Sequence, residues 1–469
     1  MIYYFVLFIS FFLIALIIKI NRFVFYALAG DSVALVNELM SDTDEDEKID
    51  LVQKKTNRLS VSLLKMLLYG VFAFAIGAIP VVIYCFVTKT GFNSLVFSSF
   101  YSILAISMGA TVPFLIPFQK KKESGYSELS QLLHKMALDN YNIANKLFKK
   151  ETKKLKRKGL DRRKDFVIVS GLARAGTTSL MNDLSRIDNF VSLSYANMPF
   201  LMCPNIWSKF YKPKNNQLKE RSHKDGIMIG LNSNEALEEY FFKVKANDSF
   251  IKDSYLSEYK ISQEDYTDYL DYQGIIKLSD RKIYLAKNNN FILRYKSVRE
   301  YNDDFVMVIL YRNPITHAAS LMEKHRYYKK LQNKDPFVLE YMNWLGHHEF
   351  GLNQKPFIFY NSENIIDEDK ESMDYWLKSW INYYRYVLTI NHPNTILVNY
   401  DSYCKNPKET IQTILKKIKM EANLPDYKPF NNPRVNDDKL SNDLQEEALE
   451  LYRQLCNGQE VGMTDKISN

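Results

Sequence analysis

The sequence predicts an α/β fold, in which helices flank a parallel sheet, preceded by transmembrane helices. Three observations lead to this prediction. The run "FVIVS" (Phe166–Ser170) is apolar and β-branched, and it continues through a glycine-bounded turn into a helix-compatible segment. A second apolar run, "DFVMVILYRNP" (Asp304–Pro314), also leads into a helix-compatible segment. Runs that are apolar throughout are typical of parallel strands buried on both faces. The third observation is a set of long uncharged segments near the N-terminus.

Length and composition limit the possible classes of protein. The 469 residues suggest two or three units, with room for a complete α/β domain. The net charge of +8 is mild and suits an anionic ligand or a membrane surface, although solubility alone would also explain it. The four cysteines have no paired spacing, so we expect a reducing compartment, no disulfide framework and no metal site. We predict no nucleic-acid partner.

Three apolar segments are each long enough to cross a membrane. Ile2–Ile18 and Phe92–Phe118 carry no charge, and Val61–Thr88 carries only Lys65. Each would cover about 30 Å as a helix. We therefore predict a membrane region over 1–123 with transmembrane helices at about 2–20, 62–88 and 92–118. A cleaved signal peptide ending at the "ALA" of Ala27–Ala29 is an alternative for the first segment, although basic residues follow its apolar run instead of preceding it.

The loops between these segments predict an orientation. Nothing basic precedes the first segment, and only Lys89 lies between the second and third. Basic residues gather in the other two connections, at Lys19, Arg22, Lys48, Lys54, Lys55, Arg58 and Lys120–Lys122. Since cytoplasmic loops carry the excess of Lys and Arg, we expect the N-terminus outside and the large C-terminal domain in the cytoplasm.

A helical linker is predicted between the membrane region and the globular domain, over 124–164. Apolar residues recur there at three- and four-residue steps, and Lys149–Lys164 holds ten basic residues against two acidic ones. The linker either lies on anionic lipid headgroups or forms a solvated helix end with a charged connection. The sequence favours neither.

The turn after the first strand has the composition of a phosphate-binding loop. Gly171 and Gly176 allow a tight turn, and amide groups at the start of the following helix converge on an anion. The residues expected to hold that anion are Gly171, Arg174, Ala175, Gly176, Thr177, Thr178 and Ser179. A nucleotide-hydrolase loop has the same glycine spacing but needs a Lys where Thr177 stands. A triphosphate with its metal therefore fits poorly, and a short anion without a metal fits better.

A second anion grip is predicted after the second strand. Arg312 ends that strand, Pro314 suits the first turn of a helix, and Ser320 lies about two helical turns further on. Arg offers a two-pronged donor and Ser a hydroxyl, so the pair would hold a second phosphate. For the pair alone, a surface Arg and a helical Ser without a ligand is the slightly favoured explanation.

Taken together, the two motifs resemble those of the sulfotransferase family, which has a P-loop-like fold. "SGLARAGTTSL" resembles its 5′-phosphosulfate loop, and "YRNPITHAAS" resembles its 3′-phosphate motif. The resemblance covers about 165–420, within a catalytic domain predicted over 165–469. It implies that 3′-phosphoadenosine 5′-phosphosulfate (PAPS) is the sulfuryl donor and that no metal takes part. The 5′ end would be held by Arg174 and Gly176–Ser179, and the 3′-phosphate by Arg312 and Ser320.

The resemblance also requires a catalytic base, which the sequence leaves open. Candidates lie in "RSHKDGIMIGLNSNEALEEYFF", where His223 titrates near neutral pH and three carboxylates, Glu235, Glu238 and Glu239, open a predicted helix. These acidic residues would also stabilise a helix N-terminus by their charge alone, without any catalytic role. Lys287 would help to stabilise the leaving phosphate, or it would be a structural ion-pair residue. His317 is expected to pack in the fold, and His347–His348 lack the partners of a metal site.

The predicted function is that of a membrane-bound sulfotransferase facing the cytoplasm. The acceptor would be a hydroxyl of a glycan, glycolipid or other membrane-associated precursor, because anchoring concentrates the enzyme at such substrates. A P-loop kinase or NTPase is an alternative, which Thr177 disfavours. A catalytically decayed membrane scaffold is another, which the intact Arg174, Arg312 and Ser320 disfavour.

Overall fold

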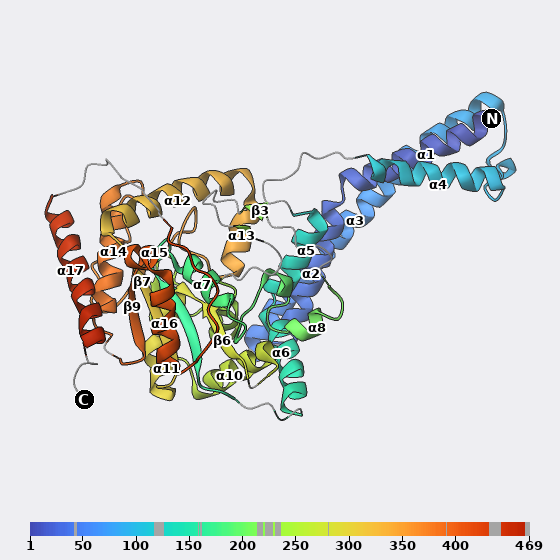
Figure 1. Ribbon diagram of the computed structural model, residues 1–469. Coiled ribbons are helices and arrows are strands. Elements are labelled where there is room, and N and C mark those ends of the chain that lie inside the picture. Colours follow the sequence, from blue (N-terminus) through green and yellow to red (C-terminus); the bar gives the residue numbers. More distant parts are fainter. Residues whose placement is uncertain are drawn as a thin grey trace. The chain divides into compact units, whose positions relative to one another are not determined.

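The structure is a computed structural model of the chain, and it divides into two compact units, Met1–Ile143 and Ala144–Asn469 (Figure 1). It describes residues 1–41, 45–116, 126–157, 159, 162–212, 219–220, 228–229, 236–279, 281–390, 392–430 and 442–464.

The first unit is made of helices. Helix α1 (Ile2–Ile20) packs along α3 (Glu45–Thr88) and α4 (Phe100–Leu115), while α2 (Phe23–Leu39) packs on α3 and α5 (Glu128–Leu138) on α2. Glycines allow close contact with α1, because an added Cβ would lie 2.2 Å from Ile14 Cγ1 at Gly77 and 2.4 Å from the Phe8 carbonyl oxygen at Gly109. Small residues have this role where apolar helices pack without water.

Two of these helices are long and apolar enough to cross a membrane, namely α1 and the Glu47–Thr88 part of α3. The predicted second span, 62–88, is the C-terminal part of a helix that already begins at Glu45. Helix α4 has 16 residues and begins at Phe100, so it covers only part of the predicted third span, 92–118, which stays a prediction. Serines explain the late start, since the Ser99 side chain caps α4 by accepting from the Ser102 amide at 3.2 Å.

Polar contacts join α2 to the N-terminal half of α3. Asp31 accepts from the Ser62 hydroxyl at 2.5 Å and pairs with Arg58 at 2.8 Å. Glu38 pairs with Lys55 at 2.5 Å. The charged half of α3 therefore has its own partners, which separates it from the apolar half that contacts α1.

The second unit is built on a five-stranded parallel sheet, which confirms the predicted α/β class. The strand order is β2-β6-β1-β7-β9. The bounds are Phe166–Gly171 for β1, Phe190–Val191 for β2, Ile283–Lys287 for β6, Val306–Tyr311 for β7 and Thr395–Asn399 for β9. The central strands β1 and β7 are buried along their whole length, as their apolar sequences require. Two short pairs, β3 (Lys219–Glu220) with β4 (Met228–Ile229) and β5 (Leu256–Ser257) with β8 (Phe357–Ile358), complete the described strands.

Helices cover both faces of the sheet (Figure 1). Their bounds are α7 Thr177–Ser185, α8 Pro204–Trp207, α9 Glu239–Ala246, α10 Gln263–Lys277, α11 Tyr295–Tyr301, α12 Pro314–Lys334, α13 Pro336–Trp344, α14 Met373–Val387, α15 Tyr400–Lys405, α16 Pro407–Lys417 and α17 Asn442–Thr464. On one face, alternate residues of β1 and β7 pack against α7 and α16 in a single apolar core that includes Val167, Val169, Leu180, Met181, Val306, Val308, Ile411 and Ile414.

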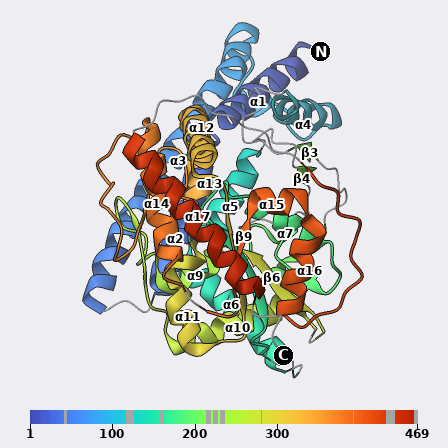
Figure 2. The same cartoon turned by 60° about the vertical axis from the view of Figure 1, so that its left-hand side comes forward.

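Helix α17 packs on α14 and on the edge strand β9 (Figure 2). The Tyr311 hydroxyl at the end of β7 donates to the Leu455 carbonyl at 3.2 Å, and the Asn399 amide donates to the Tyr452 hydroxyl at 2.8 Å. The C-terminal helix thereby closes the sheet beside the strand end from which Arg312 follows.

Helix α6 (Tyr141–Lys156) contains part of the predicted linker. Its apolar face is buried, with the Phe148 ring 5.9 Å from that of Phe241 and 6.3 Å from that of Tyr272. Lysines cover the face that remains exposed, at Lys146, Lys149, Lys150, Lys153 and Lys154. The structure therefore places this part of the basic segment on the surface of the second unit.

Candidate active site

The two predicted phosphate motifs meet at one edge of the sheet. Strands β1 and β7 are parallel neighbours, with Gly171 beside Leu310, so the loop after β1 and Arg312 after β7 begin at the same level. Arg174 Nε donates to Ser320 Oγ at 3.3 Å, and Arg312 Nη1 donates to the Arg174 carbonyl at 3.4 Å. Residues from the two motifs, 146 positions apart in the case of Arg174 and Ser320, therefore form one cluster.

The backbone of the first loop is shaped by two glycines and a strained arginine. Gly171 and Gly176 have φ angles of 148° and 97°, and Arg174 has φ 69°. A Cβ at Gly176 would lie 2.1 Å from Tyr400 Cδ2, and one at Gly171 would lie 2.7 Å from the Leu310 carbonyl oxygen. Only glycine fits these two positions without displacing neighbours. The left-handed conformation of Arg174 is typical of a residue held for function.

The start of α7 supplies amide donors. The amides of Ser179 and Leu180 donate to the Gly176 carbonyl at 3.0 and 3.3 Å. Those of Thr177 and Thr178 precede them in the first turn, where a helix has no internal acceptor to offer. The side chains of Thr177 and Thr178 are buried, and the partly exposed Ser179 follows. Such a helix start favours an anion through its amides and its dipole.

Lys287 lies beside this loop. It ends β6, the other neighbour of β1, with Lys287 in register with Val169. Its Nζ donates to Thr178 Oγ1 at 2.8 Å, and the residue is 8% exposed. The sequence left Lys287 between a helper of the leaving phosphate and a structural ion-pair residue. The structure brings its ammonium group to the phosphate loop.

Arg312 belongs to the cluster that Arg174 and Ser320 form. It is 4% exposed, its Nη2 donates to Thr316 Oγ1 at 3.4 Å, and its guanidinium carbon lies 5.5 Å from the centre of the Tyr400 ring. Arg174, Lys287 and Arg312 thus bring three cationic side chains to one strand edge, a charge distribution that would suit an anion with more than one negative group.

His317 supports the loop from α12. It is fully buried, and its Nε2 lies 2.7 Å from the Ala173 carbonyl oxygen. Burial, aided by the charge of Arg312, lowers the pKa of His317 to about 3. The ring is therefore neutral at physiological pH and donates to the loop from Nε2, in keeping with the packing role expected for it.

Glu238 and Glu239 lie behind the end of β6. Glu239 forms a two-pronged ion pair with Arg294 at 2.6 and 2.7 Å, with both side chains buried. Glu238 accepts from the Tyr269 hydroxyl at 2.5 Å and from the Asn288 amide at 3.0 Å, and burial raises its pKa. Its bond to Asn288, the residue that follows Lys287, links Glu238 to the end of β6. Both carboxylate oxygens of Glu239, by contrast, are engaged in the ion pair with Arg294.

Two other candidates for the base, His223 and Glu235, lie outside the described residues. The assignment of the base among His223, Glu235, Glu238 and Glu239 therefore stays a prediction. Within the described part of the chain, the structure contains no group of three or more His, Cys, Asp or Glu side chains that would hold a metal ion.

Sequence reasoning missed a histidine and a carboxylate near Lys287. His347 and Glu349 follow α13, and His347 Nδ1 lies 3.5 Å from a carboxylate oxygen of Glu349. Burial opposes ionisation of Glu349, but His347 and Lys287 are among the groups that hold its pKa at about 2. The available clue was the spacing of His347 and Glu349, two residues apart, but only metal binding was considered for this segment.

No protein-family model matches the chain, and a search of curated protein sequences found no match. Solved structures similar to the chain include a sulfotransferase from Mycobacterium tuberculosis H37Rv, with 13% identity, 70% of this chain and 82% of that chain covered, and a TM-score of 0.39. A sulfotransferase from Alicyclobacillus acidocaldarius has 12% identity, 64% and 95% coverage, and a TM-score of 0.31. One from Mycobacterium avium has 10% identity, 69% and 76% coverage, and a TM-score of 0.35. At these identities and TM-scores, the function of the chain has to be argued from its own site.

Proposed function

We propose that the protein is a sulfotransferase that takes its sulfuryl group from PAPS. The observation that carries this proposal is the contact of Arg174 with Ser320, which joins the two phosphate motifs at one strand edge. A donor with phosphate groups at both its 5′ and 3′ positions needs two grips at a fixed separation. The amides at the start of α7 would hold the 5′-phosphosulfate of PAPS, and Arg312 with Ser320 would hold its 3′-phosphate.

The charges of the site also suit sulfuryl transfer. As the sulfuryl group leaves, negative charge builds on the phosphate oxygen that carried it. Preorganised amides and cations at that oxygen lower the barrier, and they do so without a metal. The α7 amides, Arg174 and Lys287 would do this work, and the contact of Lys287 with Thr178 in the loop supports its part in it.

Phosphoryl transfer from ATP is the alternative that has to be tested. Lys287 approaches the phosphate loop from a neighbouring strand, so a cation is present even though Thr177 replaces the usual loop lysine. We favour PAPS because the second grip, Arg312 with Ser320, has no purpose for an ATP molecule, which lacks a 3′-phosphate.

A ligand-stabilisation experiment separates the two donors. Adenosine 3′,5′-bisphosphate (PAP), the product that PAPS leaves behind, should raise the melting temperature of the detergent-solubilised protein. At 100 times the dissociation constant the expected stabilisation is about 2.7 kcal/mol. ATP with Mg²⁺ at the same concentration should have a smaller effect. Greater stabilisation by ATP with Mg²⁺ than by PAP would contradict the proposal and favour a kinase or NTPase.

We further propose that the first unit anchors the enzyme in a membrane, with the N-terminus outside and the catalytic unit in the cytoplasm. The apolar helices expose many large apolar side chains, among them Leu67, Val71, Phe74, Phe86, Phe100, Ile103 and Leu115. Such a surface suits lipid better than water. The acceptor would then be a hydroxyl of a glycan, glycolipid or other membrane-associated precursor, and the exposed lysines of α6 would contact anionic lipid.

Sealed membrane vesicles test the location and the acceptor together. When labelled PAPS is added to inside-out vesicles that contain the protein, label should enter the extracted lipid or glycan. Right-side-out vesicles should incorporate none, because the donor does not reach the cytoplasmic face. Label restricted to right-side-out vesicles would refute the orientation, and label only in soluble compounds would refute the acceptor class.

Release of the protein from membranes by alkaline carbonate would refute the anchor. Enzyme activity that does not depend on anionic lipid would argue against the α6 contact.

A further inference from the structure

The segment between α13 and β8 contains a histidine–carboxylate pair, His347 and Glu349, whose carboxylate is close enough to Lys287 to feel its charge. It begins at Gly346, whose φ of 73° turns the chain at the end of α13. The Gly346 carbonyl accepts from the Asn290 amide at 2.9 Å, and Asn290 follows three residues after Lys287. His347 and Glu349 are therefore tied to the end of β6, the strand that carries Lys287.

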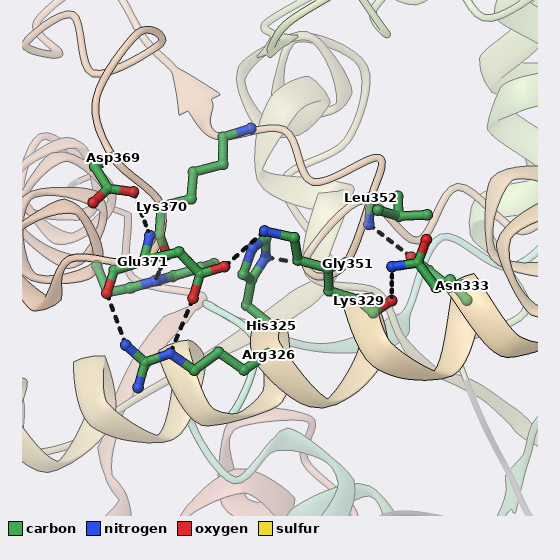
Figure 3. Close-up of polar contacts among 11 residues, drawn as sticks. His325, Arg326, Lys329, Asn333, Gly351, Leu352, Asp369, Lys370 and Glu371 are labelled. Carbon is green, nitrogen blue, oxygen red and sulfur yellow. Dashed lines mark hydrogen bonds and ion pairs between the residues drawn. The ribbon is translucent and has the colours of Figure 1, made fainter.

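Helix α12 holds the other end of this segment. His325 Nδ1 accepts from the Gly351 amide at 3.3 Å, and Gln332 Oε1 accepts from the Leu352 amide at 2.7 Å. Figure 3 shows Gly351 beside His325 on α12, and Leu352 further along the same helix, near Asn333. A Cβ at Gly351 would lie 2.2 Å from Gln332 Oε1, and the φ of Gly351 is 83°, so the segment rests closely on the helix.

The same helix carries the 3′-phosphate grip, since Ser320 lies in its first half and His325 and Gln332 in its second. Outside the segment, Glu371 braces α12 through Arg326 at 3.1 Å and Lys329 at 2.8 Å (Figure 3). One rigid element therefore positions both the donor grip and the segment of His347. Such support is what a reacting group needs to stay within reach of its substrate.

We propose that His347, oriented by Glu349, is the base that takes the proton from the acceptor hydroxyl. This inference rests on the proposed sulfotransferase function and assigns the base to a residue that the sequence analysis considered only for metal binding. Glu349 would hold the Nδ1 proton of the ring, so that Nε2 faces the acceptor. An imidazole held by a carboxylate in this way is a common arrangement for general bases.

The step balances without a further reactant. The acceptor oxygen uses an electron pair to bond to sulfur, and its proton moves to His347 Nε2. The bond between sulfur and the bridging phosphate oxygen breaks, and its electron pair stays on the phosphate, next to Lys287 and the α7 amides. The products are a sulfate ester and PAP, and His347 then releases its proton to solvent.

The test uses the full chain in membranes of the cells that produce it, with labelled PAPS as the donor and those membranes as the source of acceptor. His347→Gln should lower the initial rate of label transfer about 100-fold, within the range that general bases contribute. Glu349→Gln should lower it less, about 10-fold. PAP should stabilise both variants as it does the wild type, because neither residue belongs to the loop or the Arg312–Ser320 pair proposed to hold the donor.

A second histidine–carboxylate pair provides a matched control. His392 Nε2 lies 3.4 Å from Asp303, just before β9, at the opposite end of the strands from the site. His392→Gln should leave the rate unchanged. In the pH profile, His347→Gln should abolish the limb due to the base, while the charges of Glu349 and of Lys287, which acts on Glu349, remain. A wild-type rate and profile in His347→Gln would overturn the proposal, as would the same loss in His223→Gln alone.

The outcomes also separate this inference from the proposed function. If PAP fails to stabilise the wild type, the donor assignment fails before any base is tested. If PAP stabilises the wild type but no label is transferred, donor binding stands and the role of His347 in transfer is overturned.

Discussion

Replacing Arg312 by Ala should weaken binding of PAP about 10- to 150-fold. A hydrogen bond to a charged group contributes about 1.5–3 kcal/mol, and the guanidinium is buried at the strand edge where the 3′-phosphate would lie. Isothermal titration with PAP and with AMP measures the effect. The wild type should prefer PAP, because AMP lacks the 3′-phosphate. The variant should bind both ligands with similar affinity.

The matched control is Arg326→Ala on α12, the helix that begins two residues after Arg312. Arg326 is exposed and pairs with Glu371, so its loss should change neither PAP affinity nor the preference over AMP. Melting curves without ligand check that Arg312→Ala remains folded, since Arg312 also donates to the Arg174 carbonyl. A folded Arg312→Ala variant that keeps the preference for PAP would show that the 3′-phosphate grip lies elsewhere.

The two turns from strand to helix, after β1 and after β7, were predictable because local chemistry determines them. The apolar run from Phe166 forms β1, and Gly176 ends the loop at the residue before α7, as the glycine spacing indicated. Pro314 is the first residue of α12, and Asn313 caps it by accepting from the Ile315 and Thr316 amides. Each of these features depends on residues that are neighbours in sequence, so it can be deduced from the chain alone.

The rest of the site depends on contacts between distant residues. The position of Lys287 follows from the strand order, which sets β6 beside β1 across more than 100 residues. The position of His347 depends on bonds that reach back 26 residues from Gly351 and 20 from Leu352. The local acidic pattern favoured Glu239 as a possible base, but its buried partner Arg294 lies 55 residues away. No periodicity or spacing encodes such pairs.

Replacing Lys287 by Met should lower the rate of transfer at saturating PAPS about 100- to 1,000-fold. Methionine keeps most of the buried side chain but removes the charge that contacts Thr178. Preorganised donors at a developing negative charge have effects of this size. Because that charge builds up during transfer, the affinity for PAP should change far less than the rate. Lys282→Met is the matched control, since Lys282 is a partly exposed lysine that donates to the Asp188 carbonyl, away from the loop, just before β6.

The ratio of the two effects decides what Lys287 does. A group that acts only in the transition state lowers the rate at saturation, whereas one that binds the ground state equally well weakens donor affinity by the same factor. Equal losses of affinity and rate in Lys287→Met would make Lys287 a binding residue for the 5′ end. An unchanged rate would leave the Thr178 contact with a structural role, and charge stabilisation would then fall to Arg174 and the α7 amides.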